Sequence, residues 1–275
     1  MKNTVLTFKE MKESGEKISM LTCYDYSTAR LMDGNIDGIL VGDSLGNTMM
    51  GYGDTLPVTI DDMITYGGSV VRGCQKTFVV IDMPFMSYQL SVEQGLENAG
   101  RLMQEARCQA VKLEGGARVC PQIKAMTDAG IPVMAHLGLT PQSVNAFGGN
   151  KVQGKSEEAA RILLEDAYKV QEAGAFSVVL ECVPEQLATL ISEKLTIPTI
   201  GIGGGNGCDG QILVYQDMLG MFDDFKPKFV QHFAKIGEEM TRAFQAYNAA
   251  VKDKSFPDDD HSFHMKDPDS LKRLY

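Results

Sequence analysis

The sequence lacks several features that mark whole classes of proteins. No stretch approaches the ~18 consecutive apolar residues of a membrane-spanning helix, although 44% of the 275 residues are hydrophobic. A basic surface is missing as well, because 36 acidic residues outnumber 26 basic ones and the formal charge is −10. Such a charge repels phosphate backbones, so it argues against a nucleic-acid-binding protein.

Paired cysteines and a secretory signal are also missing. The six cysteines form no C-x-x-C pair and no dense framework, so we expect reduced thiols that mostly fill the core. The first residues, MKNTVLTFKEMKESGEK, contain no apolar stretch of the kind that precedes a signal cleavage site. These observations favour a cytoplasmic globular protein.

Short apolar runs are what the sequence has in abundance. Eight of them have the length of a strand, at residues 18–23, 38–41, 78–81, 110–113, 131–135, 177–180, 198–202 and 211–214. The runs are continuous rather than alternating, which is typical of parallel strands covered on both faces. Segments with helical spacing lie between several of them, with starts expected at Ser91, Ser156 and Pro184 and a last helix over about residues 227–251.

This alternation predicts a single-domain α/β protein, a (β/α)8 TIM barrel. We expect the barrel to span residues 1–252 and a polar tail to span 253–275. A doubly wound open sheet is the alternative. It has less support, because no G-x-G-x-x-G or G-x-x-x-x-G-K-[ST] loop follows the first strand.

Carboxylates follow several of the predicted strands. Asp43, Asp82, Glu114 and Glu181 stand where four apolar runs end, and in a parallel barrel these ends meet at one mouth. Each one alone is explained by helix capping or a loop contact. Together they would repel one another unless a cation or protons compensated them. Oxygen ligands without a histidine or cysteine cluster favour Mg²⁺ or Mn²⁺, and a carboxylate left over could act as a base.

Two further polar residues belong to the same predicted mouth. Lys112 lies two residues before Glu114, so both side chains should face the interior. This lysine is either a cation for an anionic substrate or a Schiff-base nucleophile, and the metal interpretation favours the first. His136 is a candidate donor to an oxyanion or an ordinary hydrogen-bonded histidine. The long polar loop after it is a candidate lid or a wall for a larger cosubstrate.

The chain resembles the 3-methyl-2-oxobutanoate (ketopantoate) hydroxymethyltransferase family over nearly its whole length. The matching stretches are CYDYS (23–27), LVGDSLG (40–46), LPVTIDDM (56–63), DMPFMSYQ (82–89), VKLEGG (111–116), AHLGLTPQSVNAFGG (135–149), KVQG (151–154), LECVP (180–184), GIGGGN (201–206), DGQILV (209–214) and HSFH (261–264). None of them is specific alone, but their combination is highly specific.

The resemblance implies an enzyme that transfers a hydroxymethyl group from 5,10-methylenetetrahydrofolate to 3-methyl-2-oxobutanoate through a Mg²⁺-stabilised enolate. The product would be 2-dehydropantoate, for pantothenate and coenzyme A synthesis. The family's assembly, a homodecamer, is carried over as an expectation.

Positions that match the family's motifs receive these roles by resemblance. Asp43 and Asp82 look like Mg²⁺ ligands that also lie at the substrate, with Glu114 at the metal directly or through water. Ser44 and Lys112 look like contacts to the substrate carboxylate or carbonyl, with His136 beside them, and Glu181 looks like the catalytic base.

Two other interpretations of the function stay open. One is a Mg²⁺-dependent 2-oxo acid barrel enzyme of the phosphoenolpyruvate mutase and isocitrate lyase type. The other is a catalytically silent barrel that binds a metabolite.

Overall fold

The computed structural model describes residues 2–221 and 227–274. Its strands are β1 (Ile18–Thr22), β2 (Gly38–Val41), β3 (Phe78–Asp82), β4 (Ala110–Glu114), β5 (Val133–Gly138), β6 (Ser177–Glu181), β7 (Thr199–Ile202) and β8 (Gly210–Leu213). All pairings are parallel and follow chain order, and β8 pairs with β1 to close the sheet. The predicted barrel is confirmed, and each strand end lies within about three residues of its predicted position.

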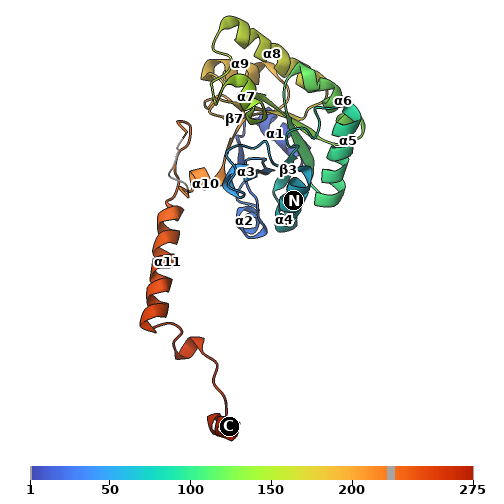
Figure 1. The fold of residues 1–275 in the computed structure, drawn as a ribbon. Coiled ribbons are helices and arrows are strands. Elements are labelled where there is room, and N and C mark those ends of the chain that lie inside the picture. Colours follow the sequence, from blue (N-terminus) through green and yellow to red (C-terminus); the bar gives the residue numbers. More distant parts are fainter. Residues whose placement is uncertain (1, 222–226, 275) are drawn as a thin grey trace. The chain divides into compact units, whose positions relative to one another are not determined.

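Helices follow most of the strands and surround the barrel, as α4, α5, α6, α8 and α9 do in Figure 1. The α-helices are α1 (Val5–Ser14), α2 (Tyr26–Met32), α3 (Leu45–Thr48), α4 (Ile60–Gly73), α5 (Val92–Arg101), α6 (Cys120–Asp128), α7 (Val144–Phe147), α8 (Glu157–Glu172), α9 (Glu185–Lys194), α10 (Tyr215–Met218) and α11 (Ile236–Asp253). A π-helical turn, η1 (Leu102–Ala106), extends α5, and the 3-10 helices are η2 (Ala117–Val119), η3 (Pro141–Ser143), η4 (Asp259–His261) and η5 (Pro268–Arg273).

The predicted helix starts are confirmed at two serines and wrong in the last helix. The Ser91 and Ser156 side chains accept hydrogen bonds from the N–H groups of Gln94 and Ala159, as N-caps do. The last helix begins at Ile236, not near residue 227. The reason is that Val230 is buried and its N–H donates to the Pro227 carbonyl, so the apolar residues there form a packed turn.

The barrel interior begins with an apolar layer at the N-terminal ends of the strands. Alternate strand residues face inward, which places Phe78 and Val80 of β3 with Met134 of β5 in one buried cluster. Helix α1, which the sequence did not predict, closes this end of the barrel. Its Phe8 is fully buried, with ring centroids 5.2 Å from Phe78.

The chain divides into two compact units, residues 1–215 with 227–230 and residues 216–226 with 231–275. The first contains the whole barrel and the second contains α11. The predicted division between a barrel at 1–252 and a tail at 253–275 stays a prediction. Among the described residues, no helix is long and apolar enough to cross a membrane.

Candidate active site

The alternation that fills the barrel with apolar side chains puts charged ones at its C-terminal end. Two residues after Val80 comes Asp82, and two after Ala110 comes Lys112, with Glu114 two residues further on. The sheet register pairs Asp82 with Lys112 and Glu114 with His136, so neighbouring strands bring these side chains together. All four residues are 3% exposed. The predicted inward face of β4 is therefore confirmed.

Lys112 is the centre of this buried cluster. Its Nζ lies 2.8 Å from Asp82 Oδ1, 3.2 Å from His136 Nδ1 and 4.0 Å from Glu114 Oε1. Burial lowers the pKa of Lys112, but the charges of Asp82, Glu114 and Asp43 outweigh burial and raise it. The side chain is thus held as an ammonium ion, which supports the cation role over the nucleophile role.

His136 connects the cluster to Glu181 at the end of β6. Its Nδ1 lies 3.3 Å from Glu114 Oε1, and its Nε2 lies 3.2 Å from Glu181 Oε2. Burial and the Lys112 ammonium lower the pKa of His136, whereas the two glutamates raise it, with a net rise to about 9. Both ring nitrogens thus face carboxylates, and the raised pKa favours the protonated ring in the metal-free protein.

Asp43 and Ser44 reach the cluster from the turn after β2. The Asp43 N–H donates to Asp82 Oδ2 over 3.0 Å, and Ser44 Oγ lies 2.7 Å from Tyr24 Oη. This approach requires glycine at position 42, since a Cβ there would lie 2.7 Å from Ser44 Oγ. Asp25, a carboxylate at the end of the neighbouring strand, has a structural role. Its side chain accepts a hydrogen bond from the Thr28 N–H and so caps α2.

The buried carboxylates differ in how readily they ionise. Burial and the charges of Asp82 and Glu114 raise the pKa of Asp43 well above its usual value. Burial also raises the pKa of Asp82, against the opposing effect of Lys112. For Glu114 burial is outweighed by His136, Lys112 and the Gln142 N–H, so its pKa is lowered. A cation added here would relieve the repulsion that keeps Asp43 from ionising.

The donor set fits a hard divalent cation that is completed by other ligands. Among residues 2–221 and 227–274 no three of His, Cys, Asp and Glu form a ready cage for a metal. Mg²⁺ does not require such a cage, because it usually takes one or two carboxylates and fills its shell with water and substrate oxygens. Asp43 and Asp82, with Glu114 nearby, are the residues here that could supply those one or two carboxylates.

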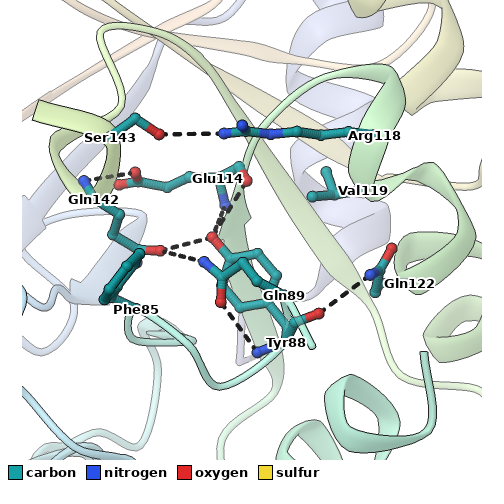
Figure 2. Close-up of a pocket in the computed structure, with 9 residues that line it drawn as sticks. All are labelled: Phe85, Tyr88, Gln89, Glu114, Arg118, Val119, Gln122, Gln142 and Ser143. Carbon is teal, nitrogen blue, oxygen red and sulfur yellow. Dashed lines mark hydrogen bonds between the residues drawn. The ribbon is translucent and has the colours of Figure 1, made fainter. Parts of the chain in front are cut away.

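Gln142 and Tyr88 belong to this site although the sequence did not single them out. Figure 2 shows Gln142, from η3, beside Glu114 and Tyr88 at the edge of a cavity of about 350 Å³. The Gln142 N–H donates to Glu114 Oε2 over 3.0 Å, and its side-chain Nε2 donates to Asp43 Oδ2 over 2.9 Å. A glutamine in a polar loop carries no pattern that predicts such contacts. The length of the loop and its match to the family pointed to the segment but not to this residue.

A closed parallel barrel with a buried lysine, histidine and carboxylates at the C-terminal strand ends defines a (β/α)8-barrel enzyme. The family model described as ketopantoate hydroxymethyltransferase matches residues 2–259. The chain belongs to the ketopantoate hydroxymethyltransferase family, which makes it a transferase and confirms the resemblance inferred from its motifs.

Individual relatives agree with the family model. Proteins of Enterococcus faecalis and Clostridium novyi are both named 3-methyl-2-oxobutanoate hydroxymethyltransferase. Each is 61% identical to this chain over 276 residues, with 100% of this chain and 100% of the relative covered. A protein of Clostridium acetobutylicum with the same name is 59% identical over 96% of each chain.

Solved structures with the same fold are much more distant in sequence. A phosphoenolpyruvate phosphomutase from Streptomyces platensis has a TM-score of 0.62 at 14% identity, with 99% of this chain and 96% of that chain covered. A 2,3-dimethylmalate lyase has a TM-score of 0.59 at 16% identity, with 100% and 95% covered. A phosphonopyruvate hydrolase in complex with oxalate and Mg²⁺ has a TM-score of 0.61 at 10% identity, with 99% and 95% covered. These likenesses concern the fold alone.

Proposed function

We propose that this enzyme transfers a hydroxymethyl group from 5,10-methylenetetrahydrofolate to 3-methyl-2-oxobutanoate, giving 2-dehydropantoate for pantothenate synthesis. The family membership and the names of the full-length relatives support the keto acid as acceptor. The folate donor is carried by the resemblance of the motifs. We place the reaction in the cytoplasm and expect a homo-oligomer, a decamer by resemblance.

Mg²⁺ is the proposed cofactor, held by Asp43 and Asp82, with Glu114 at the metal directly or through water. The buried oxygen donors suit it, and a structural neighbour carries Mg²⁺ together with oxalate, a small dicarboxylate. When bound, Mg²⁺ supplies a Lewis acid that polarises the carbonyl of the 2-oxo acid. Glu114 has the lowered pKa of a carboxylate that stays ionised.

The positive groups of the site are proposed to bind and orient the substrate. The Lys112 ammonium, which contacts Asp82 and His136, attracts the keto-acid carboxylate. His136 donates toward the carbonyl oxygen as negative charge develops there. The Ser44 hydroxyl, fixed by Tyr24, contacts the same carboxylate or carbonyl.

Glu181 is the proposed base, and its exposure is the observation that carries this role. Its side chain is 16% exposed, against 4% for Asp82 and 2% for Glu114. It is also outside the direct reach of Lys112, contacting only the imidazole of His136 within the cluster. A carboxylate at the open edge can take the C3 proton of the substrate. The carbon nucleophile left behind then bonds to the methylene carbon of the folate as one of that carbon's two C–N bonds breaks. Water replaces the second nitrogen, which gives the hydroxymethyl group, and the released nitrogens take up the protons to leave tetrahydrofolate.

The experiment that tests this proposal is deuterium exchange at C3 of 3-methyl-2-oxobutanoate in D₂O, followed by proton NMR without folate. With Mg²⁺ the C3 proton signal should disappear, and a chelator should prevent its loss. A phosphoenolpyruvate mutase-type reaction would instead act on a phosphonate or cleave a carbon bond. An intact fold that showed Mg²⁺-independent exchange or none would contradict the proposed mechanism.

A further inference from the structure

The catalytic cluster is closed off by one residue of the segment after β5. Asp43, Asp82 and Lys112 are 3–4% exposed, and Gln142 above them is 6% exposed. Of the residues assigned to the metal, only Glu114 lines the 350 Å³ cavity. Asp43, Asp82 and Lys112 are therefore nearly closed to solvent in this conformation. Movement of the segment that carries Gln142 would expose Asp43, because the Gln142 side chain lies against it.

Gln142 touches three strand ends at once. Its backbone N–H donates to Glu114, the last residue of β4, over 3.0 Å. Its Nε2 donates to Asp43 after β2 and to the Met83 carbonyl after β3, both over 2.9 Å. Its Oε1 accepts from Tyr88 Oη over 2.7 Å and from Gln89 Nε2 over 3.2 Å. The backbone N–H and the side-chain amide of Gln142 are thus all hydrogen-bonded to neighbours of the catalytic cluster. Figure 2 shows three of these neighbours, Glu114, Tyr88 and Gln89.

The orientation of the amide follows from these partners. Nε2 faces two acceptors and Oε1 faces two side-chain donors, so turning the amide over would put like groups together. Tyr88 is itself fixed, because its Oη accepts from the Glu114 N–H over 3.0 Å. The single Tyr88 hydroxyl hydrogen has Gln142 Oε1 at 2.7 Å and the Glu114 carbonyl at 3.2 Å, so the shorter contact is with Gln142. Tyr88 therefore helps to orient the Gln142 amide, whose Nε2 in turn binds the Asp43 carboxylate.

We propose that Gln142 is a positioning residue that couples closure of the segment after β5 to assembly of the metal site. In the closed state its backbone N–H and its Nε2 direct one oxygen of Glu114 and one of Asp43 toward Gln142. This leaves the other oxygen of Asp43 for the cation, while Glu114 Oε1 lies 3.3 Å from His136 Nδ1 and would reach the cation through water. Opening the segment removes both constraints together. The inference rests on the proposed function, since it takes these two carboxylates as metal ligands.

Coupling of this kind has a consequence for binding. A cation that prefers the oriented carboxylates favours the closed segment, and a closed segment raises cation affinity by the same factor. Partners that orient metal ligands typically contribute about 10- to 100-fold in metal affinity. A residue that merely closed the site sterically would change access and leave the affinity of the cation unaltered.

The test compares Gln142→Met with Gln153→Met. Methionine keeps the length of glutamine without its hydrogen bonds. Gln153 lies on the same segment, and within residues 2–221 and 227–274 its side-chain amide donates only to the Lys151 carbonyl. Mn²⁺ binding, measured by electron paramagnetic resonance of the free ion, should weaken by about 10- to 100-fold in Gln142→Met and stay unchanged in Gln153→Met. Equal affinities of Gln142→Met and the unmodified enzyme would overturn the inference.

A second measurement separates positioning from direct participation. At saturating Mg²⁺ the C3 exchange rate of Gln142→Met should recover to within a few-fold of the unmodified enzyme, because the lost orientation is compensated by mass action. Exchange that stayed low at saturating metal would show contact with the substrate and overturn the positioning role. Absence of exchange in the unmodified enzyme would instead contradict the proposed function.

Tyr88→Phe provides an independent variant should Gln142→Met fail to fold. It removes the hydroxyl that directs Gln142 and should also weaken Mn²⁺ binding. In the double variant the two effects should be less than additive, because both act through the same amide. Full additivity, or unchanged affinity in Tyr88→Phe, would contradict the coupling.

Discussion

The two ends of the barrel are equally buried and chemically opposite. At the N-terminal end, Phe8 of α1 packs among the rings of Phe78 and Phe176. At the C-terminal end, four residues further along the same strand, Asp82 lies against Lys112. Phe78 is 2% exposed and Asp82 is 3% exposed. Burial alone therefore does not distinguish the end that stabilises the fold from the end that performs the chemistry.

The difference lies in what burial does to the free energy of folding. Burying an aromatic ring stabilises the protein by several kcal/mol, on the order of 25 cal/mol per Å² of apolar surface. Burying carboxylates costs free energy unless each is paired, and Asp43, with a pKa raised by burial and two neighbouring carboxylates, is not fully compensated. Stability and function are thus separated along one set of strands, and substitutions at the two ends should have separable effects.

The largest expected effect is catalytic, at the C-terminal end. Glu181→Gln should reduce C3 exchange by about 10²- to 10⁴-fold, because the amide cannot accept the proton. Mn²⁺ affinity should stay the same, as Glu181 is not a proposed ligand. Glu185→Gln, an exposed glutamate at the start of α9, is the matched control and should exchange normally. Lost Mn²⁺ binding in Glu181→Gln would mean that the roles of base and ligand are exchanged.

At the opposite end the expected effect is on stability. Phe8→Ala should lower the free energy of unfolding by about 3–5 kcal/mol, because it leaves a cavity where a fully buried ring had been. Leu6→Ala on the same helix, where the side chain is 64% exposed, should change it little. Urea denaturation measures both. If Phe8→Ala altered Mn²⁺ affinity in the folded protein, the separation between the two ends would be refuted.

The smallest expected effect is a gain in stability that depends on pH. The folded pKa of Asp43 is raised, so ionisation opposes folding and this cost grows as pH rises above the unfolded value of about 3.9. Between the two pKa values it grows by about 1.4 kcal/mol per pH unit. In the presence of a chelator, Asp43→Asn should thus be more stable than the unmodified protein at neutral pH and equal to it below about pH 3.9.

Asn keeps an acceptor for the Gln142 amide, so the comparison isolates the charge of Asp43. Asp128→Asn is the control, since its carboxylate is 64% exposed beside Lys124 and should show no such gain. Thermal denaturation across pH measures the difference. A destabilised Asp43→Asn at neutral pH would show that Asp43 is already compensated in the metal-free protein.

Strand positions and the inward face of β4 could be predicted because they depend on local pattern. Eight apolar runs mark eight strands, and the two-residue spacing of Lys112 and Glu114 places both inside. The contacts of Gln142 could not be predicted, because they depend on where three strand ends meet in space. The same holds for α1, whose sequence VLTFKEMKES offers only two buried side chains, Phe8 and Met11.

The start of α11 was mispredicted for a related reason. The apolar residues from Phe229 to Phe233 have a spacing that suits a helix, yet a Cβ at Gly203 would lie 2.9 Å from the Phe229 ring. Tertiary packing thus determines this turn, and tertiary packing cannot be read from a window of a few residues. The candidate site was therefore predicted by residue type, while the partners that orient it came only from the structure.

Pairing of the first strand with the last has a consequence for how the chain is made. Ile18 lies in register with Gly210, so a nascent chain leaving the ribosome carries β1 with one edge unmatched until nearly all of the barrel has been synthesised. The hydrogen-bonding groups on that edge are then open to wrong pairing. Final closure is necessarily a late, long-range event, and folding of this barrel should be slow compared with that of a helical protein of similar length.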